Sequence, residues 1–334
     1  MSSFLEARGN SLQANPNVFR YPDSSDINIT RRGAEFYWGI TAIMAISALT
    51  IIGLSFRVHR SKRIFHYITA VICLVASIAY FTMASNLGYA AIAVEFQRSD
   101  AEVRGLYREV FYVRYIDWFV TTPLLLLDLL LTAGLPWPTV LYTIMIDLIM
   151  IVTGLVGALV ASSYKWGYFV FSTVSLFIIA YQVVIVGRAH ARAIGTSKVY
   201  TACGAWTIGL WFIYPIAWGL SEGGNIISPD SEAVFYGVLD FLAKPVFGAL
   251  LLWGHRNIDP ATLGLHIRDY DERPIGRSLA ANKEAHGIDN GVTTGYNNGT
   301  TPATATAANT NINTTGTGTG TTGVTGTNPN TSSV

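Results

Sequence analysis

Charged residues and cysteines are both scarce in this chain. Lys, Arg, Asp and Glu make up 13% of its 334 residues, roughly half the share found in soluble domains. A net charge of +1 gives no basic footprint for nucleic acid, which excludes that class of partner. The two cysteines, Cys73 and Cys203, stand in separate apolar runs, so the sequence predicts neither a disulfide framework nor a metal site. With 51% apolar residues, the composition indicates a lipid bilayer as the main partner.

Seven apolar stretches are each long enough to cross about 30 Å of hydrocarbon. They run over residues 36–56, 64–87, 110–132, 139–161, 168–187, 200–220 and 233–253. The predicted fold class is therefore all-α, a bundle of seven transmembrane helices within residues 35–256. Basic residues flank the first and fifth connections, whereas the sixth carries acids only. The positive-inside rule then predicts an extracellular N-terminal segment, 1–34, and a cytoplasmic C-terminus.

Two segments outside the spans have their own character. Residues 88–104 form the longest connection and are rich in Ala, Val and Phe, which favours a short hairpin over the outer face. Residues 257–334 form a polar cytoplasmic tail that becomes mostly Thr, Gly, Asn and Ala. From about residue 286 such a composition buries too little apolar area to offset its ordering entropy, so we predict disorder there.

A lysine lies in the middle of the last span. Lys244 is roughly 18 Å from Glu232 at 1.5 Å per residue, too deep for its amine to reach water. One interpretation is that an aldehyde condenses with this amine as a Schiff base. The other is an ion pair with Asp240, one turn earlier on the same face, that holds helices together.

The third span carries two acids on one face. Asp117 and Asp128 are 11 residues apart, about three turns and roughly 16 Å, and the same stripe holds Thr121 and Arg114. We expect Asp117, near Arg114, to be ionised. Asp128 lies among leucines and is expected to keep its proton, because desolvation disfavours the charged form. This layout indicates a proton path; the alternative is two acids that only join helices by hydrogen bonds.

The sixth span carries aromatic residues on one face. Trp211, Tyr214, Pro215 and Trp218 follow the i, i+3, i+4, i+7 spacing. Such a stripe is often ordinary packing or an interfacial belt, but these residues reach the depth of Lys244, where a flat conjugated ligand fits better. A further buried acid in the fourth span, Asp147, is expected to accept a hydrogen bond from a hydroxyl such as that of Thr122.

Four strings in these spans resemble the microbial (type I) rhodopsins, most closely the fungal proton-pumping branch whose archetype is bacteriorhodopsin. They are Arg-Tyr-x-Asp-Trp-x-x-Thr-Thr-Pro-Leu-Leu-Leu-Leu-Asp-Leu (114–129), Asp-x-x-Met-x-x-x-Gly-Leu-Val-Gly-Ala (147–158), Trp-x-x-Tyr-Pro-x-x-Trp (211–218) and Leu-Asp-x-x-Ala-Lys (239–244). The resemblance covers about residues 36–256 in order.

The resemblance implies a cofactor, all-trans retinal, bound to Lys244 as a protonated Schiff base. It implies Asp117 as primary proton acceptor, Asp240 as second counter-ion with Arg114 completing the charge complex, and Asp128 as cytoplasmic donor. Glu222 and Glu232 are similar to the extracellular proton-release pair. The implied retinal pocket comprises Tyr115, Trp118, Thr122, Leu125, Met150, Gly154, Ser172, Thr173, Leu176, Trp211, Tyr214, Pro215, Trp218 and Ala243.

Two positions depart from the family pattern. Phe169 replaces the tryptophan that stacks on the retinal ring, which we expect to alter colour more than mechanism. Met83 stands where the second span usually has a tyrosine near the Schiff base, so one hydrogen bond to the counter-ion region has no assigned donor.

The function implied is that of a light-driven outward proton pump, a transporter of protons in the plasma membrane rather than an enzyme. The alternative is a slow-cycling sensory photoreceptor; Asp128 argues against it, since many sensors lack the donor carboxyl. No signalling partner is identified, and a homo-oligomer is left open. A receptor coupled to a G protein would carry Asp-Arg-Tyr or Asn-Pro-x-x-Tyr, which this sequence does not. A retinal-free relative usually lacks the lysine.

Overall fold

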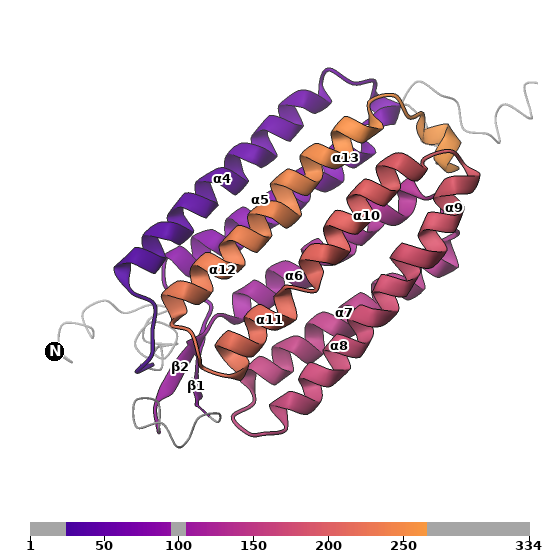
Figure 1. Ribbon diagram of the computed structural model, residues 1–334. Coiled ribbons are helices and arrows are strands. Elements are labelled where there is room, and N and C mark those ends of the chain that lie inside the picture. Colours follow the sequence, from indigo (N-terminus) through magenta and orange to yellow (C-terminus); the bar gives the residue numbers. More distant parts are fainter. Residues whose placement is uncertain (1–24, 95–104, 266–334) are drawn as a thin grey trace, which may run out of the picture. The chain divides into compact units, whose positions relative to one another are not determined.

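Seven long apolar helices account for most of the computed structural model, which describes residues 25–94 and 105–265 (Figure 1). The spans are Arg31–Ser55, Ile64–Ala84, Tyr112–Thr132, Trp137–Leu159, Lys165–Ala193, Ser197–Gly223 and Pro229–His255. The prediction of an all-α protein with seven membrane-spanning helices is confirmed. The predicted disordered tail and most of the N-terminal segment lie outside the described residues. The predicted sidedness of the two termini stays a prediction.

Four spans are single helices and three are made of shorter pieces. The single helices are α4 (Arg31–Ser55), α5 (Ile64–Ala84), α6 (Tyr112–Thr132) and α7 (Trp137–Leu159). The fifth span joins α8 (Lys165–Tyr181), the π-turn η2 (Gln182–Gly187) and α9 (Arg188–Ala193); the sixth joins α10 (Ser197–Trp211), α11 (Tyr214–Trp218) and the π-turn η3 (Gly219–Gly223). The seventh joins α12 (Pro229–Phe241), the π-turn η4 (Leu242–Val246) and α13 (Phe247–His255). Short 3₁₀ turns, η1 (Arg60–Lys62) and η5 (Pro260–Leu263), lie at one end of the bundle.

The spans pack in a closed ring in the order of the sequence. Each of the first four contacts the next, the fifth contacts the sixth through η2 and α9, and α12 returns to α4. Residues of α6 are the most buried, two thirds of its apolar window against about a quarter for α4 and α7. Large apolar side chains such as Leu49 and Phe171 point outward, as expected where lipid is the solvent. The polar stripe of α6 therefore faces the interior of the bundle.

Prolines break the sixth and seventh spans beside the bundle centre. Proline has no N–H to donate to the carbonyl four residues earlier and its ring crowds that carbonyl. Accordingly α10 ends at Trp211, four residues before Pro215, and α12 ends at Phe241, four before Pro245. The two breaks are linked, because the Trp206 indole donates to the Leu242 carbonyl at 3.0 Å. Lys244 thus stands on a π-turn, a form of helix that often marks functional sites.

The fifth span is longer than predicted. It continues to Ala193, so Arg188 and Arg192, expected in or near a loop, belong to α9. The reason is that Gly187 keeps helical dihedrals, φ −63° and ψ −38°, so the helix ends only before Gly195, whose φ is +82°. Helix ends are otherwise within a few residues of the prediction.

The hairpin predicted after the second span is present, with its second strand later than expected. Strand β1 (Ala90–Ala93) pairs antiparallel with β2 (Tyr107–Val110), Ala90 opposite Val110. Val110 was assigned to the third span, but α6 begins only at Tyr112. The strands lie at the end of the bundle where α12 begins (Figure 1).

Candidate functional site

The amine of Lys244 lies between two carboxylates. Its Nζ is 3.0 Å from Asp117 Oδ2 and 2.8 Å from Asp240 Oδ1, and the lysine side chain is 2% exposed. The π-turn directs Lys244 inward, and α6 brings Asp117 to it from across the bundle. The predicted pair with Asp240 therefore exists, and it is one half of a three-residue charge cluster.

The two carboxylates have different surroundings. Asp240 accepts O–H hydrogen bonds from Tyr80 and Tyr214, each at 2.7 Å, and an N–H from Trp118 at 3.3 Å. Asp117 Oδ1 has no hydrogen-bond partner among the described residues. The Thr121 hydroxyl donates to the Asp117 backbone carbonyl rather than to its carboxylate. Asp240 is thus satisfied by neighbours, whereas Asp117 has a free oxygen.

Tyr80 supplies the hydrogen bond that the sequence left without a donor. It lies one turn before Met83 on α5, and Met83 packs instead in an apolar cluster with Tyr37 and Phe111. The family pattern predicts this tyrosine at position 83, whereas the structure has it at position 80. A polar group every three or four residues on an otherwise apolar helix face would have indicated position 80 as well.

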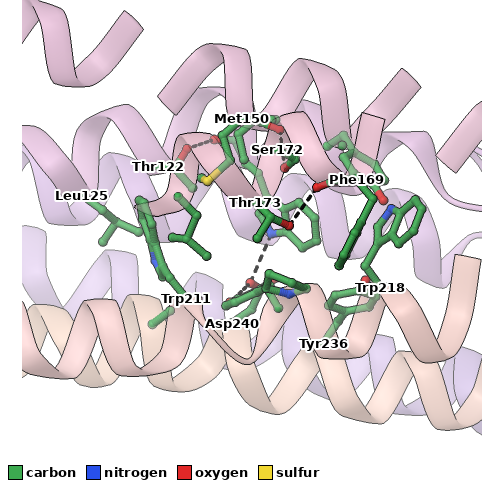
Figure 2. A pocket seen from close by; sticks show the side chains of 18 of the residues that line it. Thr122, Leu125, Met150, Phe169, Ser172, Thr173, Trp211, Trp218, Tyr236 and Asp240 are labelled. Carbon is green, nitrogen blue, oxygen red and sulfur yellow. Dashed lines mark hydrogen bonds between the residues drawn. The ribbon is translucent and has the colours of Figure 1, made fainter. Parts of the chain in front are cut away.

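A cavity opens beside Lys244 and is lined by aromatic residues. It encloses about 770 Å³, its open mouth included. Figure 2 shows Trp211 and Trp218 at its two ends and Asp240 along one side. All fifteen residues predicted to bind retinal, Lys244 included, line this cavity. The residues that line it without having been predicted to bind retinal are Ile151, Phe169, Tyr236 and Asp240.

Polar side chains in the cavity wall are mostly bonded to the protein. The Thr122 hydroxyl is 2.8 Å from Asp147 Oδ2 and 2.8 Å from the Trp118 carbonyl, which confirms the expected contact of that buried acid with Thr122. Ser172 donates to the Met150 carbonyl at 2.9 Å. Phe169 stacks on Trp218 with ring centroids 5.1 Å apart and planes 27° apart. The wall is therefore chemically apolar toward the cavity.

The cavity suits a long, flat, apolar group attached at Lys244. Indole and phenol rings provide planar walls, and Lys244 and Asp240 are the charged residues among those that line it. The free oxygen of Asp117 next to the amine can accept a proton. A pocket that is apolar apart from a few convergent polar groups is typical of cofactor sites.

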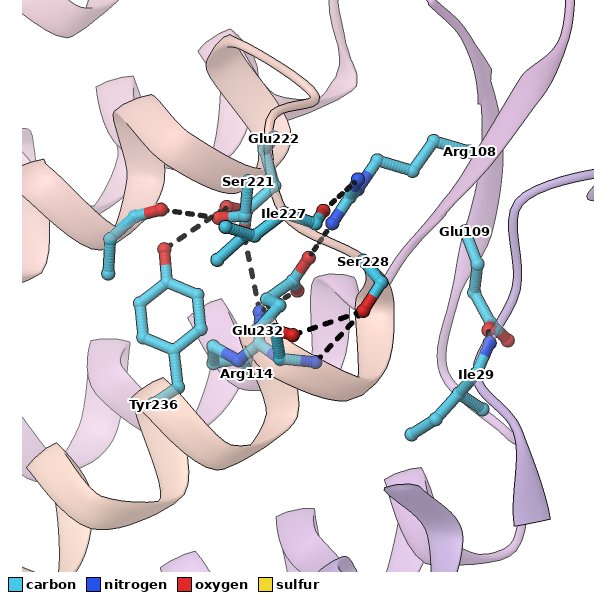
Figure 3. A network of polar contacts seen from close by, with 12 residues as sticks. Ile29, Arg108, Glu109, Arg114, Ser221, Glu222, Ile227, Ser228, Glu232 and Tyr236 are labelled. Atoms are coloured by element: carbon cyan, nitrogen blue, oxygen red, sulfur yellow. Dashed lines mark hydrogen bonds and ion pairs between the residues drawn. The ribbon is translucent and has the colours of Figure 1, made fainter. Parts of the chain in front are cut away.

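A buried network joins the N-terminal ends of α6 and α12 to the hairpin (Figure 3). Arg114 bonds Glu232 at 2.7 Å, Glu222 at 3.2 Å and the Tyr37 hydroxyl at 2.9 Å. The structure thus brings together Glu222 and Glu232, predicted as a pair. Arg114 was expected to complete the charge complex at Lys244, but in the described part of the chain its ion pairs are with these glutamates.

Two basic residues of this network were not predicted. Arg108 on β2 donates to Glu232 at 2.7 Å and to the Ile227 carbonyl at 2.8 Å. Lys165 on α8 is buried and donates to the Glu222 carbonyl at 2.6 Å. Both stand at the edges of predicted spans, where charges are normally solvated, so nothing in the sequence indicates their burial.

Glu109 is a buried acid beside the same network. It is 1% exposed; its Oε2 accepts the Ile29 N–H at 2.7 Å and its Oε1 has no hydrogen-bond partner in the described ranges. Burial raises the pKa of Glu109 to about 7, and the charge of Glu232 adds to this, while the Ile29 N–H and Arg108 act against it. The group therefore titrates near neutral pH.

Asp128 lies at the opposite end of α6 from Arg114, without any exposure to solvent. The Thr69 hydroxyl is 3.2 Å from Asp128 Oδ2 and 2.7 Å from the Phe65 carbonyl. One hydroxyl hydrogen cannot serve both acceptors, so both contacts are hydrogen bonds only when Asp128 carries a proton. The geometry thus agrees with the expectation of a protonated Asp128.

This combination defines a class: a seven-helix membrane protein with a buried lysine, paired carboxylates and an aromatic cavity. Residues 34–258 match the family model described as bacteriorhodopsin-like protein. The chain is 58% identical over 309 residues to the opsin-like protein carO of Fusarium fujikuroi, covering 90% of this chain and 99% of that one.

Solved structures agree with this match. The rhodopsin CsR of Coccomyxa subellipsoidea is 39% identical, with a TM-score of 0.64 over 67% of this chain and 97% of that one. LR (Mac) of Leptosphaeria maculans is 36% identical, with a TM-score of 0.66 over 70% and 99%. The chain belongs to the bacteriorhodopsin-like family of microbial rhodopsins. It is a multi-pass integral membrane protein of an ion-pump family, not an enzyme, and the family implies a retinal chromophore.

Proposed function

We propose that this chain is a light-driven outward proton pump in which Lys244 holds retinal covalently. The observation that carries the proposal is the position of the Lys244 amine, at the wall of an aromatic cavity and within 3.0 Å of two carboxylates. Bound there, retinal would supply light absorption, and its isomerisation would weaken the hold of the Lys244 nitrogen on its proton. Two solved relatives, CsR and LR (Mac), are described as light-driven proton pumps, which supports the assignment.

Asp117 is the acceptor in this proposal because it has an oxygen available. Three donors already bond Asp240, and hydrogen bonds to a carboxylate favour its charged form. Asp240 therefore stays ionised and neutralises the cation at Lys244. Asp117, with Oδ1 unpartnered, gains most from taking a proton.

In this proposal the proton leaves through the network around Arg114, and Asp128 supplies the next proton to the Lys244 nitrogen. A proton on Asp117 removes a negative charge beside the path to Arg114, whose guanidinium is shared between Glu222 and Glu232. Such tightly coupled buried groups redistribute protons when one charge changes. Asp128 is buried, and within the described residues its carboxyl has Thr69 as its hydrogen-bond partner, so it is positioned to return a proton from the other side. We assign that side to the cytoplasm and the membrane to the plasma membrane.

Illumination of cells that express the chain with added retinal tests the proposal. Light should acidify the medium, a protonophore should abolish the change, and Lys244→Ala should give neither colour nor signal. A flat trace from a coloured, slow-cycling protein would overturn the pump and favour the sensory photoreceptor.

A further inference from the structure

A histidine closes a ring of contacts around Asp128. His255, the last residue of α13, is partly exposed, and its ring lies 4.2 Å from that of Phe65. Its Nε2 is 3.0 Å from the hydroxyl of Thr132, one turn beyond Asp128 on α6. The Phe65 carbonyl in turn accepts the hydrogen bond of Thr69. His255 therefore contacts Phe65 on α5 and Thr132 on α6, two residues close to Asp128, and is still partly exposed to solvent.

The hydrogen bonds of the ring fix which nitrogen exchanges protons. Nδ1 is 2.8 Å from the Leu251 carbonyl, which can only accept, so Nδ1 carries a hydrogen in either charge state. Nε2 is left as the titrating atom, and it faces Thr132. The exchangeable position of the imidazole thus points at the hydroxyl that bonds the Asp128 backbone carbonyl.

When the imidazole is neutral, the Thr132 hydroxyl faces two hydrogen-bond acceptors but has one hydrogen to donate. It lies 2.7 Å from the Asp128 backbone carbonyl and 3.0 Å from Nε2. When the ring is an imidazolium, Nε2–H donates to Thr132 and the hydroxyl donates to the carbonyl, so every contact is satisfied. Protonation of His255 therefore sets the direction of the hydroxyl.

We infer that His255 takes up the proton that Asp128 regains from the cytoplasmic water, with the Thr132 hydroxyl as a positioning group that holds Nε2. This hydroxyl bonds the backbone carbonyl of Asp128 and not its carboxylate, so it orients the imidazole and does not itself carry the proton. The inference rests on the proposed function. One proton leaves Nε2 of the imidazolium, one arrives on a carboxylate oxygen of Asp128, and the neutral ring then takes a proton from the solvent. Once Asp128 is protonated, its Oδ2 holds the proton and donates to the Thr69 hydroxyl, which in turn donates to the Phe65 carbonyl.

Other charged groups surround His255 at this end. His66 on α5 acts on it electrostatically, and Thr132, which it contacts, lies one turn beyond Asp128 on α6. Arg256 follows directly, with its guanidinium over the Trp253 ring at 4.2 Å. Lys62 and Asp259 pair at 3.7 Å near the surface. From the start of α10, Thr196 contributes an uncharged hydroxyl that donates to the Thr132 carbonyl.

Flash photolysis of the full-length, retinal-loaded protein in lipid tests the relay. A pH-indicator dye follows proton uptake, and the visible spectrum follows the return of the proton to the Lys244 nitrogen. His255→Phe keeps an aromatic ring against Phe65 but has no proton to give, so uptake should slow tenfold or more while the return from Asp128 keeps its rate. Thr132→Val should slow uptake likewise and Thr132→Ser should restore it. His190→Phe, an exposed histidine on α9, is the matched control.

The pH dependence of proton uptake distinguishes a proton-transfer role of His255 from a packing role. Uptake in the native protein should follow one titrating group between about pH 5 and 8, and His255→Phe should lose that dependence. Equal uptake in His255→Phe and His190→Phe would overturn the relay alone. A native protein that shows no light-driven uptake would instead overturn the pump.

A second measurement does not require retinal. Nitrogen NMR of the retinal-free protein should show that His255 keeps its Nδ1 hydrogen across this pH range and titrates at Nε2. A neutral ring with its hydrogen on Nε2 would contradict the assignment of Nε2 as the titrating nitrogen.

Discussion

Asp117 and Asp240 flank one amine, yet they differ in how many of their oxygens are already bonded. Tyr80 and Tyr214 hold Asp240, whereas Asp117 keeps a free oxygen. Roles of two nearby acids are often set by such differences in surroundings. The role assigned to a single residue can be tested by removing one hydrogen-bond donor or one carboxyl group.

Asp128→Asn removes the proposed donor and keeps the shape of the side chain. Reprotonation of the Lys244 nitrogen should slow by about 100-fold or more. Azide, a small diffusible acid, should restore the rate by carrying protons into the site. Flash photolysis measures both, and an unchanged decay would contradict the assignment of Asp128.

Tyr80→Phe leaves the Asp240 carboxylate one donor short in a buried site. The loss of such a hydrogen bond destabilises a protein by about 1–3 kcal/mol, so the thermal unfolding temperature should fall. Met83→Leu on the same helix conserves volume and should cost less than about 1.5 kcal/mol. If the two variants are equally stable, Tyr80 does not hold Asp240.

Helices that stop at prolines and a two-stranded hairpin shape the site at the level of elements. Pro215 and Pro245 end α10 and α12 beside the cavity, which places Trp211 and Lys244 at its wall. The hairpin brings Arg108 onto Glu232 and buries Glu109 against Ile29. A short sheet at the rim thus adds charged groups to a bundle that is otherwise helical.

Glu109 should make stability depend on pH near neutrality. Its pKa is raised from 4.5 to about 7, so between these values the folded protein holds a proton that the unfolded chain has lost. The stabilisation is complete below about pH 4.5 and is lost as pH rises through 7. Unfolding temperatures of the native protein should fall over this range relative to Glu109→Gln. Parallel curves would contradict the raised pKa.

The orientation of the chain across the membrane is a property of the whole molecule. With the N-terminus outside, Ile226 in the sixth connection faces the medium and Arg57 in the first faces the cytoplasm; both are exposed. In intact cells an impermeant thiol reagent should label Ile226→Cys and leave Arg57→Cys unlabelled until the cells are opened. Cys73 and Cys203 are buried and should give little background. The reverse pattern would invert the topology.

The sequence predicted those parts of the molecule that depend on local pattern. Apolar runs gave all seven spans, and the family strings gave every predicted residue of the cavity wall. It did not predict the burial of Arg108 and Lys165, because charges at span ends are normally solvated. Nor did it predict the partners of Arg114, since a guanidinium at the end of a long side chain can reach several acids, and tertiary packing decides which.

The hydrogen bond from Trp206 to the Leu242 carbonyl ties together two places where helices are mechanically weak. Helices behave as stiff rods that bend where their hydrogen-bond ladder is interrupted. If one half of the sixth span tilts about its break, the indole pulls on backbone only two residues from Lys244. Strain at the lysine can therefore reach a neighbouring span directly, without passing through the contents of the cavity.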